Sequence, residues 1–133
     1  RGSTPLGDAI YYNNRLESFM IYYHNPRCSK SRKGLELLEE SKKDYKIKLY
    51  LSEDLSFSEI KNLIKKLKMK PQDLIRKNEK VIKEEGLKFD DMSDDEIISL
   101  LIEYPILIER PILVSSDKAI VGRPPELIKS MLK

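Results

Sequence analysis

Residues 19–40 read FMIYYHNPRCSKSRKGLELLEE, and the change of pattern inside this stretch decides the fold. The apolar run 19–23 is typical of a buried strand, whereas residues 29–40 place leucines on one face of a helix. Cys28 therefore lies where a strand passes into the first turn of a helix. Unpaired N–H groups and the helix dipole at such a position favour the thiolate over the thiol. We interpret Cys28 as a reactive cysteine rather than an inert, buried one.

Several polar residues surround this cysteine in the sequence. Arg27, Arg32 and His24 are expected to add positive charge near the thiol. A histidine at a strand end is either a hydrogen-bonded part of the scaffold or a group that tunes the cysteine. Ser31, one helical turn beyond Cys28, either donates a hydrogen bond to the thiolate or only covers the helix start.

The composition predicts a small single domain. The chain has 133 residues, one cysteine and a net charge of +3. Residues 1–19 begin without methionine and lack periodicity, so we expect an expression tag or a disordered extension before a domain of residues 20–133. One cysteine and no apolar stretch of about 18 residues favour a cytoplasmic protein without a membrane partner. The small, interleaved charge also argues against nucleic acid, and we expect a monomer with no bound metal.

Arginine is rare in this chain, which uses lysine for most of its positive charge. A forked guanidinium suits carboxylates and oxyanions, so the arginines are candidate ligands of an anion. Apart from Arg1 and Arg15 in the first segment, they are Arg27, Arg32, Arg76, Arg110 and Arg123. Each also has a structural alternative. Arg76 fits an exposed helix, Arg110 has Glu103 and Glu109 as possible partners, and Arg123 fits the cap of a strand.

The order of the remaining elements predicts an α/β domain. Residues 45–51 alternate apolar and polar, which indicates a half-buried strand and completes a βαβ unit with parallel strands. Capping boxes at Ser56 and Ser93 begin helices that run to about residues 68 and 102. Between them, Pro71 begins a short helix that carries Arg76, and residues 80–85 form a further helical turn. Residues 112–115 and 118–121 predict a hairpin, and a final helix follows residues 122–126.

Four sequence strings together resemble those of the glutaredoxin-dependent arsenate reductase family, the ArsC-like branch of the thioredoxin superfamily. They are YHNPRCSKSR (23–32), LIRKN (74–78), IERPI (108–112) and GRPPE (122–126). The resemblance implies a thioredoxin-like fold, with βαβ and ββα halves around a small mixed sheet. A helical insertion, about residues 56–104, separates the two halves.

The resemblance also implies roles for individual residues. Cys28 corresponds to the family's nucleophile and His24 to the histidine that tunes it. Arg76, Arg110 and Arg123 correspond to its oxyanion-binding arginines. Pro111 corresponds to a proline that the superfamily places, with a cis peptide bond, beside the active cysteine. From their positions in the sequence rather than from the resemblance, Arg32 and Ser31 are expected to support the cysteine.

The implied activity is reduction of arsenate to arsenite. Cys28 attacks arsenic to give a thioarsenate, glutathione takes over at this adduct as co-substrate, and glutaredoxin reduces the mixed disulfide. No bound cofactor is needed. The single cysteine fits this scheme, because any resolving thiol must come from outside. Arg27 and Lys30 make the surroundings of the cysteine more positive than in the best-studied reductases.

Two other functions use the same features. A glutathione-dependent thiol–disulfide oxidoreductase needs the same cysteine, although three oxyanion-binding arginines exceed what disulfide exchange requires. A regulator like the Spx proteins shares the fold and binds RNA polymerase without catalysis. Many of those proteins carry a Cys-x-x-Cys switch, which Ser31 excludes in this chain.

Overall fold

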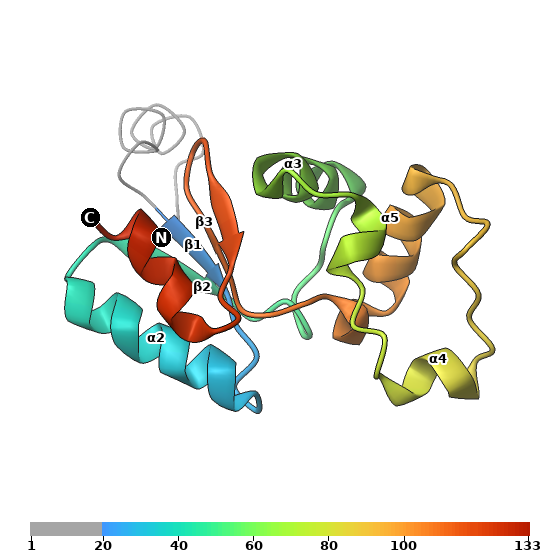
Figure 1. The fold of residues 1–133 in the computed structure, drawn as a ribbon, viewed down its shortest axis with the longest axis horizontal. Coiled ribbons are helices and arrows are strands. Elements are labelled where there is room, and N and C mark those ends of the chain that lie inside the picture. The colour runs from blue at the N-terminus through green and yellow to red at the C-terminus, as the bar shows by residue number, and fades with distance from the viewer. Residues whose placement is uncertain (1–19) are drawn as a thin grey trace.

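The computed structural model describes residues 20–133, which form a four-stranded mixed sheet with helices on both sides (Figure 1). The interpretation of residues 1–19 falls outside these residues. The strand order is β2-β1-β3-β4, with β1 and β2 parallel and the other two pairs antiparallel. The strands are β1 (Met20–Tyr23), β2 (Tyr45–Lys48), β3 (Ile112–Val114) and β4 (Ala119–Val121). The parallel βαβ unit and the C-terminal hairpin are both confirmed.

One face of the sheet is covered by α2 (Ser29–Ser41) and η3 (Pro125–Met131), which lie side by side in Figure 1. Tyr22, Leu38 and Ile128 are fully buried between them and the strands. The expected final helix is present as a 3₁₀ helix. Burial of these large side chains is the main force that packs α2 and η3 against the sheet.

The helical insertion lies on the other side of the sheet (Figure 1). Its two long helices, α3 (Phe57–Leu67) and α5 (Asp94–Glu103), pack against each other. Both predicted capping boxes are present: Ser56 accepts from the Glu59 N–H at 3.1 Å, and Ser93 accepts from the Glu96 N–H at 3.2 Å. The shorter elements are η1 (Pro71–Leu74), α4 (Lys80–Glu84) and η2 (Pro105–Leu107).

Strand β2 is shorter than the predicted strand of residues 45–51. It ends at Lys48, and the Leu49 carbonyl accepts the N–H groups of Ser52 and Glu53 in a tight turn. The turn breaks the alternation, so Leu49 is exposed and Tyr50 is fully buried instead. The apolar–polar alternation therefore predicted the strand correctly. It did not predict which of the side chains are buried.

The sequence predicted that Arg76 lies on a short helix, and this prediction is wrong. The 3₁₀ helix η1 ends at Leu74, and Ile75 pairs with Ile108 in an isolated antiparallel bridge. The Arg76 N–H then donates to the Leu107 carbonyl at 2.6 Å. Backbone pairing across these two segments, rather than helical periodicity, sets the direction of the Arg76 side chain.

Gly34 permits the close approach of α2 to the sheet, which gives a testable prediction. A Cβ atom at this position would overlap the hydroxyl of Tyr22 and contact Pro111 at 3.5 Å. Although alanine favours helices over glycine, we expect Gly34→Ala to destabilise the protein by about 1–3 kcal/mol in urea unfolding, because overpacking forces a buried side chain to move.

Two control variants test this explanation. Lys33→Ala changes the exposed neighbour and should alter stability by less than about 0.5 kcal/mol. Adding Tyr22→Phe to Gly34→Ala removes the atom that the new Cβ meets, so the double variant should lose less than the two single losses combined. Simple additivity would contradict the proposed clash.

Candidate active site

Cys28 is the N-cap residue of α2, directly beyond the loop that follows β1. Its N–H donates to the Asn25 carbonyl at 3.0 Å, and the Asn25 side chain accepts the Arg27 N–H at 3.0 Å. These bonds fold the loop back on itself. The thiol is half-buried at the helix N-terminus, as the sequence predicted.

The surroundings of Cys28 lower the pKa of its thiol. Burial alone raises this pKa, but the N–H groups of Ser31 and Lys30 and the guanidinium of Arg110 stabilise the thiolate and lower it by more. The direction agrees with the prediction. The cation responsible is Arg110, distant in sequence, rather than the neighbouring Arg27 or Arg32.

Strand register brings Arg110 to the cysteine. Tyr23 at the end of β1 lies opposite Ile112 at the start of antiparallel β3. The residues that follow β1 therefore lie beside those that precede β3. The Arg110–Pro111 peptide bond is cis, as the resemblance implied.

Ser31 joins the residues around the cysteine through hydrogen bonds. Its hydroxyl accepts the Asn25 N–H at 3.0 Å and lies 2.7 Å from Nδ1 of His24, while its carbonyl accepts from the Tyr22 hydroxyl at 2.7 Å. It is the Ser31 N–H, not the hydroxyl, that stabilises the thiolate. Ser31 is thus a structural support of the loop.

His24 is buried next to this serine. Burial, and to a lesser degree the charge of Arg32, lower the pKa of His24, so its imidazole is neutral at pH 7. Arg32 itself donates to the Pro26 carbonyl at 2.8 Å and so holds the loop from outside. Both residues therefore orient the loop that carries Cys28.

The three predicted arginines form one cluster, joined by two glutamates. Glu79 Oε2 lies 3.0 Å from Arg76 Nε and 3.4 Å from Arg110 Nη2. Glu109 Oε1 lies 3.6 Å from Arg76 Nη1 and 4.0 Å from Arg123 Nε. The alternative pairing of Arg110 with Glu103 or Glu109 is therefore wrong, since its carboxylate partner is Glu79.

Arg110 occupies the centre of this cluster. It is 7% exposed, and its Nη1 donates to the Ile106 carbonyl at 2.8 Å. Its own carbonyl accepts from Arg123 Nη1 at 3.1 Å. The structure thus places the Cys28 thiol, three guanidinium groups and two carboxylates together, which is a suitable arrangement for binding a small anion close to sulfur.

Tyr50 and Glu79 are site residues that the sequence analysis missed. The Tyr50 hydroxyl is buried and has no hydrogen-bond partner within residues 20–133, yet its pKa responds to the charges of Arg110 and Cys28. Burial raises the pKa of Tyr50 to about 12, so the hydroxyl stays protonated. Periodicity could not find Tyr50. Glu79, three residues after Arg76, could have been noticed from the spacing alone.

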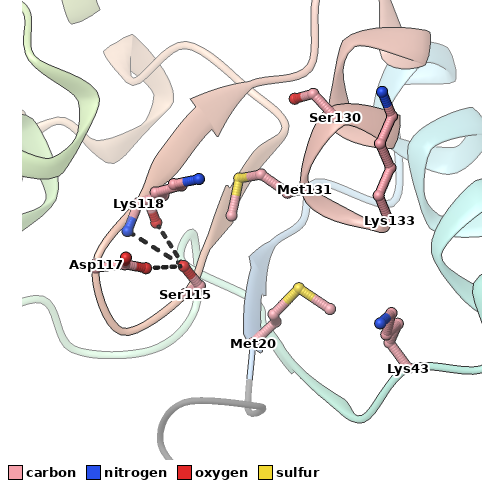
Figure 2. Close-up of a pocket in the computed structure, with 8 residues that line it drawn as sticks. All are labelled: Met20, Lys43, Ser115, Asp117, Lys118, Ser130, Met131 and Lys133. Atoms are coloured by element: carbon pink, nitrogen blue, oxygen red, sulfur yellow. Dashed lines mark hydrogen bonds between the residues drawn. The ribbon is translucent and has the colours of Figure 1, made fainter.

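Several hollows lie outside the arginine cluster. One of them, shown in Figure 2, lies at the end of β1 opposite to Cys28 and is lined by Met20, Lys118 and Lys133 among others. Its volume is about 350 Å³. Another, of about 590 Å³, lies at the start of α2 and is lined in part by Pro26, Ser29, Arg32 and Lys33. Within residues 20–133, no group of three acidic, histidine or cysteine side chains is placed to hold a metal ion. In the same part of the chain, no helix is both long and apolar enough to span a membrane.

Comparison with known proteins identifies the family. The sequence profile of the ArsC family matches residues 23–131. The chain belongs to the ArsC family. An arsenate reductase of Haemophilus influenzae is 40% identical over 114 residues, which cover 85% of this chain and 98% of that protein. The protein YfgD of Escherichia coli, which is described as uncharacterised, is 40% identical over 107 residues, covering 80% and 90% respectively.

The family fold is confirmed by solved structures. The arsenate reductase from Vibrio cholerae superposes with a TM-score of 0.79 at 38% identity, covering 85% of this chain and 97% of that one. The thioredoxin-like architecture expected from the resemblance is therefore present. In this ArsC-family chain, Cys28 lies beside Arg110, and Glu79 and Glu109 link Arg110 to Arg76 and Arg123.

The lowered pKa of Cys28 predicts fast alkylation near neutral pH. A lower pKa means a larger thiolate fraction at pH 7, so the rate of iodoacetamide alkylation should reach half its maximum below the free-thiol value of about 8.5. Arg110→Gln should move this midpoint upward, whereas Arg27→Gln, an exposed change, should not. Circular dichroism verifies that both variants are folded. Equal midpoints for the two variants would remove Arg110 as the activating cation.

The unpartnered hydroxyl of Tyr50 gives a prediction about stability. Tyr50→Phe should leave the free energy of unfolding unchanged or raise it by about 1 kcal/mol, because a buried polar group without a partner is costly. Tyr23→Phe is the matched control, because its hydroxyl donates to Glu59 at 2.6 Å and its loss should cost about 1–2 kcal/mol. Urea unfolding measures both, and an equal loss in the two variants would refute the assignment.

Proposed function

We propose that this protein is an arsenate reductase that uses Cys28 as its nucleophile and glutathione with glutaredoxin as external reductants. The observation that carries the proposal is the Arg110 guanidinium beside the Cys28 thiol, linked through Glu79 and Glu109 to Arg76 and Arg123. Relatives about 40% identical that bear the name arsenate reductase support the choice of substrate.

The first step follows from the charges in the site. Arsenate is a tetrahedral anion that repels a thiolate, and three guanidinium groups offset this repulsion while holding arsenic near sulfur. The Cys28 thiolate forms an S–As bond and an As–O bond breaks. The departing oxygen takes up protons and leaves as water. His24 and Ser31 orient the loop that carries the thiolate.

The second step needs a thiol from outside the protein. Cys28 is the only cysteine in the chain, so a glutathione thiol attacks the thioarsenate. Arsenic accepts two electrons and leaves as arsenite, and a disulfide between Cys28 and glutathione remains for glutaredoxin to reduce. The hollow beside the start of α2, lined by Pro26, Arg32 and Glu36 among others, supports the approach of an external thiol such as glutathione. A cytoplasmic location would supply both reductants.

The decisive experiment couples arsenate reduction to NADPH oxidation through glutathione, glutathione reductase and glutaredoxin. Wild-type protein should oxidise NADPH only when arsenate and glutathione are both present, and Cys28→Ser should be inactive. Oxidation with a model disulfide but not with arsenate would favour a thiol–disulfide oxidoreductase. Inactivity with every substrate, together with binding to RNA polymerase, would favour the regulator.

Lysine substitutions test the arginine cluster. Arg76→Lys, Arg110→Lys and Arg123→Lys keep the charge but lose the planar fork, so each should lower arsenate turnover at least about ten-fold, equivalent to about 1.4 kcal/mol. The control is Arg27→Lys, at an exposed position, which should keep wild-type turnover. Full activity in all three cluster variants would show that these arginines do not bind the oxyanion.

A further inference from the structure

The two carboxylates in the arginine cluster are used differently. Glu79 Oε2 accepts a hydrogen bond from Arg76 Nε at 3.0 Å and another from Arg110 Nη2 at 3.4 Å. Glu109 Oε1 is buried without a hydrogen-bond partner in the part of the chain that the structure describes. Its two guanidinium neighbours, at 3.6 and 4.0 Å, attract it electrostatically but lie beyond hydrogen-bond distance. Glu79 Oε2 is therefore engaged by two donors, whereas Glu109 Oε1 is a buried acceptor without a donor.

An unused donor lies in the same cluster. The Nε atom of Arg110 is also buried and has no acceptor among residues 20–133. Buried polar atoms are costly when they stay unpaired, and a site that contains one spare donor and one spare acceptor matches a ligand with the opposite pair. A tetrahedral oxyanion that carries a proton is such a ligand, because its bare oxygens accept and its O–H donates.

We propose that Glu109 is a specificity-determining residue that accepts a hydrogen bond from the O–H of a protonated tetrahedral oxyanion. The inference rests on the proposed function in that it concerns the same anion site. Hydrogen arsenate and hydrogen phosphate carry such a proton near neutral pH, and sulfate does not. Sulfate would place bare oxygens against the Glu109 carboxylate, so the site rejects it.

The charge balance of the cluster agrees with this role. Three arginines and two glutamates leave one formal positive charge, and ionisation of Cys28 cancels it. A multiply charged anion therefore gains little from net charge alone. Its affinity must come from directed hydrogen bonds, to which a proton on the ligand contributes one more.

The test measures how well anions protect Cys28 from iodoacetamide at pH 7 and constant ionic strength. The probes are arsenate, phosphate and sulfate, and the readout is the concentration that halves the alkylation rate. For wild type, this concentration should be at least about ten-fold higher for sulfate than for phosphate, because a site built for a ligand O–H discriminates strongly against its absence. Equal protection by phosphate and sulfate, or none by any of the three anions, would overturn the proposal.

Variants then locate the selectivity. Glu109→Gln supplies an N–H that can donate to sulfate, so the sulfate-to-phosphate ratio should fall to about one. Glu109→Asp keeps the carboxylate but shortens the side chain, so the carboxylate lies further from the bound anion. Phosphate should then protect Cys28 less well, and protection by sulfate should not increase. Glu103→Gln removes an equal charge at an exposed position of α5 and should keep the wild-type ratio. An unchanged ratio in Glu109→Gln would overturn the assignment, and if that variant does not fold, the wild-type ratio and Glu109→Asp decide.

Failure of this inference can be told apart from failure of the proposed function. Selective protection by phosphate and arsenate without arsenate turnover would support the proposed role of Glu109 and contradict the proposed reductase activity. Turnover of arsenate together with equal protection by sulfate would support the reductase activity and contradict the proposed role of Glu109.

Discussion

The site depends on one buried guanidinium, that of Arg110. A buried positive charge needs acceptors, and the two Nη atoms of Arg110 find them in the Ile106 carbonyl and the Glu79 carboxylate. These contacts join the segment before β3 to the segment after η1. Because β3 is antiparallel to β1, the same guanidinium lies beside the thiol at the start of α2. A single charged group thus ties the helical insertion, the sheet and the cysteine loop together.

The two carboxylates in the cluster offset the electrostatic repulsion between its three arginines. Three guanidinium groups held together without counterions would repel one another and would be poorly solvated. Glu79 and Glu109 offset that repulsion while leaving hydrogen-bonding capacity at Arg110 Nε and Glu109 Oε1. The cluster is therefore stabilised as an ion-pair network whose hydrogen-bond donors are already oriented. Such preorganisation lowers the cost of binding and of charge development during reaction.

Local sequence patterns predicted the features that local physics determines. The strand before Cys28, the capping boxes at Ser56 and Ser93 and the parallel βαβ unit all follow from periodicity and short-range hydrogen bonds. The position of Arg76 was predicted wrongly because a backbone bridge to Ile108 overrides its helical surroundings.

The residues that sequence reasoning missed depend on contacts between distant segments. Tyr50 is buried because the chain turns after Lys48, and Glu79 matters because Arg110 approaches it from far along the sequence. Cys28 was singled out by its place between a strand and a helix and the arginines by their rarity, and the family resemblance then selected Arg76, Arg110 and Arg123 among them. Their residue types alone could not show that they meet.

The activation of Cys28 also has a consequence for the life of the protein before it is folded. The cysteine lies near the start of the domain and Arg110 near its end, so during synthesis the thiol leaves the ribosome long before its activating cation. In the unfolded chain neither the helix N-terminus nor the guanidinium is present, and the cysteine is an ordinary thiol. The reactive anion is generated by the completed tertiary structure, so a newly made or damaged chain is spared the reactivity of the finished enzyme towards oxidants and electrophiles.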